Sequence, residues 1–217
     1  MKKIPSRLVE WKDVVRWCSA IGEKVAESGF RPDAVVGLAR GGWIPARLVS
    51  DELGVKQLIS LRTQHWGVTA SKDGKASLST TIQEAVDGRR LLIVDDITDT
   101  GDSIRLAFEH ASSLSPAAVR TATMLHINHS TFRPDYYAEE VDAVKWTWYV
   151  FPWNYGEDMA TFIANILSDG PRSLKEVSAA LKDYNNLSIN DRKLLDTMNR
   201  FSKLGIVLKK DGHWEKC

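Results

Sequence analysis

The sequence predicts an α/β protein built on a twisted parallel sheet with helices on both faces. Short apolar segments are typical of buried strands, and the clearest of them are 34–39 and 90–95. Segments with helical spacing of apolar residues, 43–53 and 102–113, follow these two strands. Because parallel strands need a crossover connection, usually a helix, this alternation indicates consecutive βαβ units.

The remaining elements of the main domain follow from the same patterns. A first helix is expected over residues 8–27, where apolar side chains recur at helical spacing: Val14, Val15, Cys18, Ile21 and Val25. Two more strands are expected at 57–62 and 119–127. The segment 63–79 is polar and rich in glycine and lysine, so we expect a mobile loop there.

A different pattern begins after residue 170. Two helix starts and one tight hairpin turn are expected, at 173–176, 188–191 and 211–212. The first has the Ser-x-x-Glu spacing of a capping box. We therefore divide the chain into a main domain, 1–170, and a small winged-helix-like module of two helices and a hairpin, 171–217.

Composition excludes several classes of protein. The 217 residues include 29 basic and 28 acidic side chains, a net charge of +1, so no overall attraction to nucleic acid or anionic membranes is expected. The two cysteines provide neither a disulfide framework nor a cysteine zinc site. No apolar segment has the length of a membrane span, and no apolar stretch typical of a signal peptide follows the basic start. We expect a cytoplasmic protein.

The segment LLIVDDITDTGDS, 91–103, is the most informative one. A buried strand ends at the adjacent carboxylates Asp95 and Asp96, and a loop rich in threonine leads into a helix. Such a loop offers backbone N–H groups and a helix N-terminus to an anion, while carboxylates accept hydrogen bonds from sugar hydroxyls. The pattern therefore predicts a site for a sugar phosphate such as ribose 5-phosphate. Taken alone, Asp-Thr-Gly would indicate only an acidic helix cap.

Residues 91–103 resemble the phosphoribosyl-diphosphate (PRPP) signature of type I phosphoribosyltransferases. The resemblance implies the type I phosphoribosyltransferase fold, with a small hood at about 126–156. It also implies that Asp95 and Asp96 contact the ribose hydroxyls. The same two acids would contact Mg²⁺, largely through PRPP and water. It implies a 5-phosphate loop of six residues: Thr98, Asp99, Thr100, Gly101, Asp102 and Ser103. Asp99 coincides with the general base that 6-oxopurine members use near purine N7. The Asp102 carboxylate would repel a phosphate unless it points away.

The segment after the first buried strand resembles the pyrophosphate loop of the same family: Ala39, Arg40, Gly41 and Gly42. Arginine pairs well with phosphate, and glycines let backbone N–H groups approach a ligand closely. In isolation the same residues would indicate a helix start beside a surface arginine. Their place one βα unit before the acid pair favours the pyrophosphate loop. The resemblance implies a non-proline cis peptide here, which would be Arg40–Gly41.

The polar segment 63–79 corresponds in position to the catalytic loop that closes over PRPP in this family. A closing loop suits the chemistry because water must be kept from the reacting sugar. Lys72 and Lys75 are candidates for contacts to pyrophosphate, and solvated lysines are the alternative. The sequence does not identify which residue acts.

The segment KWTWYVFPWN, 145–154, holds three of the eight tryptophans and resembles the hood of xanthine-guanine phosphoribosyltransferases. The resemblance implies base contacts from Trp148, Tyr149 and Asn154, with Trp148 stacked on the purine. The alternative is an aromatic core strand in which Trp146 and Trp148 pack at a period of two.

The region 125–133 departs from the family, because it lacks the lysine that usually donates to purine O6. Asn128 falls at the corresponding position and is our candidate for a base contact. The departure leaves the accepted base open, with a 6-oxopurine favoured and adenine as the alternative. His126 and His129 are expected to be structural, because no cysteine or acid lies at metal-ligand spacing from them.

The resemblance implies a Mg²⁺-dependent purine phosphoribosyltransferase of nucleotide salvage that acts as a homo-oligomer. It would transfer the phosphoribosyl group of PRPP to a purine base, with pyrophosphate and a nucleoside monophosphate as products. The alternative is a PRPP- or nucleotide-sensing regulator that binds nucleic acid through 171–217. That module has a net charge of +4, against −3 for 1–170. Its basic residues alternate with acidic ones, whereas a DNA-reading face has a stronger basic stripe, so the enzyme is favoured.

Overall fold

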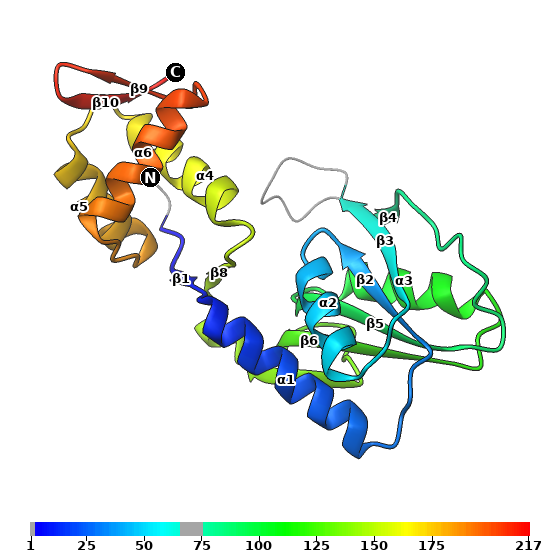
Figure 1. Cartoon of the computed structure of the whole chain (residues 1–217). Coiled ribbons are helices and arrows are strands. Elements are labelled where there is room, and N and C mark those ends of the chain that lie inside the picture. The colour runs from blue at the N-terminus through cyan, green and yellow to red at the C-terminus, as the bar shows by residue number, and fades with distance from the viewer. Residues whose placement is uncertain (1–2, 66–75) are drawn as a thin grey trace. The chain divides into compact units, whose positions relative to one another are not determined.

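The computed structural model describes residues 3–65 and 76–217. The chain forms two compact units. The first spans Lys12–Lys145, and the second combines the N-terminal residues up to Trp11 with Trp146–Cys217. The predicted boundary at residue 170 therefore lies inside the second unit. Each unit is described in turn (Figure 1).

The unit Lys12–Lys145 contains a six-stranded sheet in the order β4-β3-β2-β5-β6-β7. Its strands are β2 (Ala34–Ala39), β3 (Leu58–His65), β4 (Ala76–Leu78), β5 (Arg90–Thr98), β6 (Ala118–Ile127) and β7 (Tyr136–Val141). All pairs are parallel except β3 with β4. The predicted parallel sheet is confirmed. The expected loop 63–79 includes strand residues near both of its ends. Strand β3 continues to His65, and β4 pairs with it in antiparallel fashion.

Helices cover both faces of this sheet (Figure 1). They are α1 (Trp11–Glu27), α2 (Trp43–Glu52) and α3 (Asp102–Ser112), and a short 3₁₀ helix, η1 (Ala143–Lys145), ends the unit. A Cβ at Gly37 would lie 3.0 Å from the side chain of Ala46 in α2. The neighbours Val36 and Leu38 pack in the same core cluster as Ile104 of α3. Because successive strand residues point to opposite faces, α2 and α3 lie on opposite sides of the sheet.

The predicted face of α1 is correct except at one position. Val14, Cys18, Ile21 and Val25 are buried, but Val15 is 52% exposed. Trp17 takes its place in the core and is 1% exposed. Val15 and Trp17 both lie beside the apolar face of the helix. The side chain with the larger apolar surface, Trp17, is the one that is buried.

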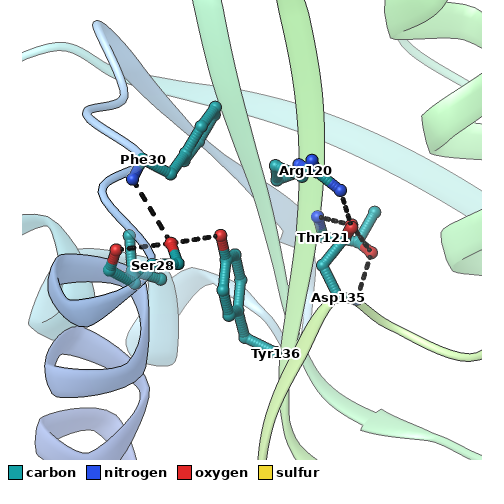
Figure 2. A network of polar contacts seen from close by, with 7 residues as sticks. Ser28, Phe30, Arg120, Thr121, Asp135 and Tyr136 are labelled. Atoms are coloured by element: carbon teal, nitrogen blue, oxygen red, sulfur yellow. Dashed lines mark hydrogen bonds and ion pairs between the residues drawn. The ribbon is translucent and has the colours of Figure 1, made fainter.

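Strand β7 is anchored at its start by a polar network that Figure 2 shows. Asp135 accepts hydrogen bonds from the backbone N–H of Thr121 at 2.9 Å and from its hydroxyl at 3.0 Å. The other carboxylate oxygen pairs with Arg120 at 2.5 Å. The next residue, Tyr136, shares a 2.8 Å hydrogen bond with Ser28, just after α1. These contacts fix the connection between β6 and β7.

The second unit pairs the N-terminal strand β1 (Ser6–Leu8) in parallel with β8 (Trp148–Val150). Its other elements are α4 (Tyr155–Leu167), α5 (Leu174–Asn185), α6 (Asp191–Lys203), β9 (Val207–Lys210) and β10 (His213–Lys216). One apolar core joins them, with Met159, Phe201 and Trp214 all buried. Because α4 contributes to this core, the helix packs with the C-terminal elements.

Two of the three predicted C-terminal signals are confirmed. Ser173 and Glu176 form the reciprocal hydrogen bonds of a capping box. Asp211 and Gly212 have φ of 48° and 78°, the two positive values that a primed hairpin turn requires. Ser188 does not cap α6. Asn190 does so, since its side chain accepts from the N–H of Arg192 at 2.9 Å, and an Asn at this place is as good a cap as Ser.

None of the helices within the described residues is long and apolar enough to cross a membrane.

Candidate functional site

The adjacent acids lie near the end of β5, at the edge where α/β sheets bind ligands. Asp96 is 9% exposed, and its Oδ1 accepts a hydrogen bond from the N–H of Ile97 at 2.8 Å. The N–H of Asp96 donates to Asp95 Oδ1 at 2.9 Å. Burial, together with the charge of Asp96, raises the pKa of Asp95 well above its ordinary range. A carboxylate pair held in this way would be stabilised by hydroxyl donors or a cation.

The predicted pyrophosphate loop packs directly on the acid pair. A Cβ at Gly41 would lie 2.1 Å from Asp96 Oδ2, and one at Gly42 would lie 2.4 Å from the carbonyl oxygen of Val94 in β5. The N–H of Gly42 donates to the carbonyl of Leu38 at 2.8 Å. We expected both glycines to open N–H groups to a ligand. The N–H of Gly42 is instead bonded to Leu38, whereas an open N–H at Gly41 stays a prediction, and both glycines let the loop approach β5.

The cis peptide is one bond earlier than predicted. It joins Ala39 to Arg40, not Arg40 to Gly41. Ala39 is the last residue of β2 and still pairs in register with Arg62 of β3. The chain therefore leaves the strand at Arg40, and the reversal begins there. Arg40 itself is exposed, as an anion-binding arginine in this loop would be.

The predicted phosphate loop joins β5 to the N-terminus of α3. Thr98 is buried, and its hydroxyl donates to Thr123 of β6 at 3.1 Å, so this side chain belongs to the sheet. The hydroxyl of Thr100 donates to Asp102 Oδ2 at 2.9 Å. Gly101 caps α3 with φ of 92°, a conformation that favours glycine. Ser103 lies in the first turn of α3.

Asp99 lies 3.0 Å from His129, measured between Oδ1 and Nε2. His129 follows β6, the strand next to β5 in the sheet. His126 is buried, and burial lowers the pKa of its imidazole. Among the described residues, no group of three or more His, Cys, Asp or Glu side chains could hold a metal ion. The pairing of Asp99 with His129 was not predicted, although β5 and β6 are parallel neighbours whose carboxyl ends place both turns at the same sheet edge.

Comparison with known proteins identifies the family. Residues 6–160 match the family described as phosphoribosyl transferase domain. The chain belongs to the phosphoribosyltransferase family. The match spans the acid pair and both predicted phosphate-binding loops, so the predicted family and fold class are confirmed.

Relatives of this phosphoribosyltransferase chain are named for purine substrates. It is 29% identical over 151 residues to a xanthine-guanine phosphoribosyltransferase of Cereibacter sphaeroides, covering 67% of this chain and 85% of that protein. It is 26% identical over 156 residues to a hypoxanthine-guanine phosphoribosyltransferase of Schizosaccharomyces pombe, covering 60% and 75%. The crystal structure of a purine phosphoribosyltransferase from Pyrococcus horikoshii matches with a TM-score of 0.60 and 29% identity, covering 69% and 94%.

The remaining candidates within the phosphoribosyltransferase sheet unit are Asn128 and the catalytic loop. Asn128 Oδ1 accepts a hydrogen bond from the N–H of Ala143 at 2.9 Å, so its carbonyl holds the following loop in place. The side chain therefore has a structural role, and a contact to the base stays a prediction. Lys72 and Lys75, the candidates for pyrophosphate contacts, lie outside the described residues.

The predicted hood residues belong to the second unit. Trp148 is half-buried against the core of that unit and lies edge-on to Trp146, with ring centroids 6.3 Å apart. Tyr149 stacks beside Phe151 at 6.4 Å. Asn154 is the N-cap residue of α4, without a side-chain cap bond. The contacts of Trp148 are those of an aromatic core strand, and its stacking on a base stays a prediction.

Proposed function

We propose that the protein transfers the 5-phosphoribosyl group of PRPP to a 6-oxopurine base, with pyrophosphate and a nucleoside monophosphate as products. One observation supports this most strongly: the loop that follows β2 packs through Gly41 on the carboxylate of Asp96 at the end of β5. The predicted pyrophosphate loop, the acid pair and a helix N-terminus thus share one sheet edge. The names of the relatives indicate purine bases, and they do not favour a sensing regulator.

Each part of PRPP has a counterpart in this arrangement. Asp95 and Asp96 would accept hydrogen bonds from the ribose hydroxyls, because ionised carboxylates act as acceptors. The loop from Asp99 to Ser103 and the N-terminus of α3 would hold the 5-phosphate through backbone N–H groups and the helix dipole. The Arg40 guanidinium would pair with the departing pyrophosphate. The contact of Asp102 with Thr100 gives its carboxylate a partner other than the ligand.

The acid pair also fits the Mg²⁺ that the family implies. Carboxylate oxygens are ligands that Mg²⁺ prefers, and Mg²⁺ commonly uses one or two carboxylates together with substrate phosphates. Asp95 and Asp96 supply that number, and a bound cation would favour the ionised form of Asp95, against the burial that raises its pKa. Bound there, the ion would neutralise charge on the pyrophosphate.

The residues of this chain would act on both sides of the reacting carbon. Negative charge grows on pyrophosphate as its bond to ribose C1 breaks, and Arg40 would stabilise that charge. The base nitrogen forms the new bond to C1, and Asp99 would accept the proton that the base releases. Holding the base in line with C1 would supply a further large part of the rate.

The test is pyrophosphate release with PRPP, Mg²⁺ and each of five bases: hypoxanthine, guanine, xanthine, adenine and uracil. We expect activity with at least one 6-oxopurine and none with uracil. Asp99→Asn should lower turnover by about 10²–10⁴-fold while PRPP still binds in calorimetry. The double variant Asp95→Ala with Asp96→Ala should lose PRPP affinity. Absence of pyrophosphate release with every base would refute the proposal.

A homo-oligomeric assembly and a cytoplasmic location stay predictions from the sequence. Sedimentation of the purified protein tests the first, and fractionation of cells that express the full chain tests the second.

A further inference from the structure

The turn that follows β6 is bound tightly to the predicted phosphate loop. The N–H of Thr131 donates to the carbonyl of Thr100 at 3.1 Å, and the Thr131 hydroxyl donates to the same oxygen at 3.0 Å. Arg105 of α3 also contacts the Thr131 hydroxyl. A Cβ at Gly101 would lie 2.6 Å from Ser130 Oγ, which shows how closely the two segments approach. The backbone on either side of Asp99 and His129 is therefore held in place.

The two side chains meet within this fixed frame. His129 Nε2 lies 3.0 Å from Asp99 Oδ1. The two atoms lie at ion-pair distance, and a positively charged imidazole would be attracted to the carboxylate. The two side chains are 44% and 47% exposed, and ion pairs with that exposure contribute little to stability. Any consequence of the contact lies in the orientation of the Asp99 carboxylate.

We propose that His129 is a positioning residue for Asp99, which rests on the proposed function of Asp99 as the proton acceptor. The imidazole, 3.0 Å from Oδ1, restricts the orientations that the carboxylate can take before the base arrives. In the reaction the bond from C1 to pyrophosphate breaks with its electron pair, and a base nitrogen bonds to C1. The N–H proton of the base then passes to the Asp99 carboxylate. His129 keeps its own proton throughout and makes no contact with the reacting atoms.

The experiment compares His129→Ala, His129→Gln, Asp99→Asn and the double variant Asp99→Asn with His129→Ala. His129→Ala should lower kcat about tenfold, leave the KM for PRPP within about twofold, and leave the unfolding midpoint unchanged. His129→Gln should recover most of kcat, because its polar amide group can occupy the same place beside Oδ1. In the Asp99→Asn background, His129→Ala should have no further effect. His213→Ala is the matched control at an exposed histidine in the other unit, and it should leave kcat unchanged.

Three results would overturn the proposal. The first is wild-type kcat in His129→Ala. The second is an equal loss in the Asp99→Asn background, and the third is a fall in PRPP affinity and unfolding midpoint that matches the loss of kcat. An inactive wild-type protein would refute the proposed function itself, whereas an active wild type with any of these three results refutes only the role of His129.

Discussion

Replacement of Gly41 by alanine tests how the pyrophosphate loop meets the acid pair. The new methyl carbon would lie 2.1 Å from Asp96 Oδ2, 2.6 Å from Cγ and 2.8 Å from Oδ1. These atoms form a whole carboxyl group at the end of a short side chain, so rotation of a distant flexible end cannot relieve the clash. Either the loop moves away from β5, or Asp96 turns and loses its 2.8 Å hydrogen bond from the N–H of Ile97.

Both responses lower stability and damage the proposed site. Overpacking of a well-packed position costs about 1–3 kcal/mol, and loss of the Ile97 hydrogen bond accounts for about 1 kcal/mol of that when Asp96 turns. We expect Gly41→Ala to lower the free energy of unfolding by about 2 kcal/mol and to weaken PRPP binding. Urea denaturation measures the first quantity and calorimetric titration with PRPP the second.

A double-mutant cycle distinguishes this clash from a general effect of the loop. Asp96→Ala removes the atoms that the new methyl group meets, so adding Gly41→Ala to it should lower stability little further. PRPP binding should stay weak in the double variant, since the carboxylate is gone. Gly156→Ala is the control, because its methyl group would meet only the Arg200 guanidinium, at 3.3 Å. Unchanged stability in Gly41→Ala, or additive losses in the double variant, would refute the packing described for this loop.

Two further predictions concern stability. Burial raises the pKa of Asp158 to about 6, against the opposing effect of the Trp148 indole, so the ionised carboxyl destabilises the fold above that pH. Asp158→Asn should therefore stabilise the protein by about 1–2 kcal/mol at pH 7.5, after allowance for solvent screening, and the gain should vanish at pH 4. Thermal unfolding across this range measures it, and a gain independent of pH would contradict it. Asp135→Ala removes the acceptor of the Thr121 N–H and should cost about 1–3 kcal/mol in urea denaturation. Asp51→Ala, which breaks an exposed ion pair, should cost less than about 1 kcal/mol, and equal losses in the two variants would contradict the role of Asp135.

The sequence predicted the strands that the sheet buries on both faces and missed those at its edges. Strand β2 and residues 91–94 of β5 are unbroken apolar segments, because helices cover both faces of the sheet there. Strand β7 reads YYAEEV and is mostly half-buried, so its pattern differs little from that of a loop. Strand β1 has only three residues, and its partner β8 lies far along the chain. No local pattern indicates such a pairing.

The candidate site likewise has a part that the sequence predicted and a part that it did not. Asp95, Asp96 and the phosphate loop were predictable because they are contiguous in the sequence and follow a clear strand. The predicted end of β2 at Ala39 is correct, but the position of the cis peptide at Ala39–Arg40 is a backbone detail that the sequence pattern does not specify. The contact between His129 and Asp99 depends on the adjacency of β5 and β6 and on side-chain reach. The adjacency of β5 and β6 follows from the topology, whereas the reach of the two side chains is known only from the structure.

The three turns of the site constrain one another, and this explains why glycines occur where they do. Gly41 brings the loop after β2 onto Asp96, and Gly101 brings the loop after β5 onto Ser130 in the turn after β6. Each glycine therefore lets its turn pack on a neighbouring segment, strand β5 for Gly41 and the turn after β6 for Gly101, at a place where a Cβ would clash. A ligand that orders one turn must also order the turn beside it, because their close approach leaves little room for independent movement. The arrangement would couple the binding of pyrophosphate, ribose and 5-phosphate along a single sheet edge, as a substrate that carries all three groups requires.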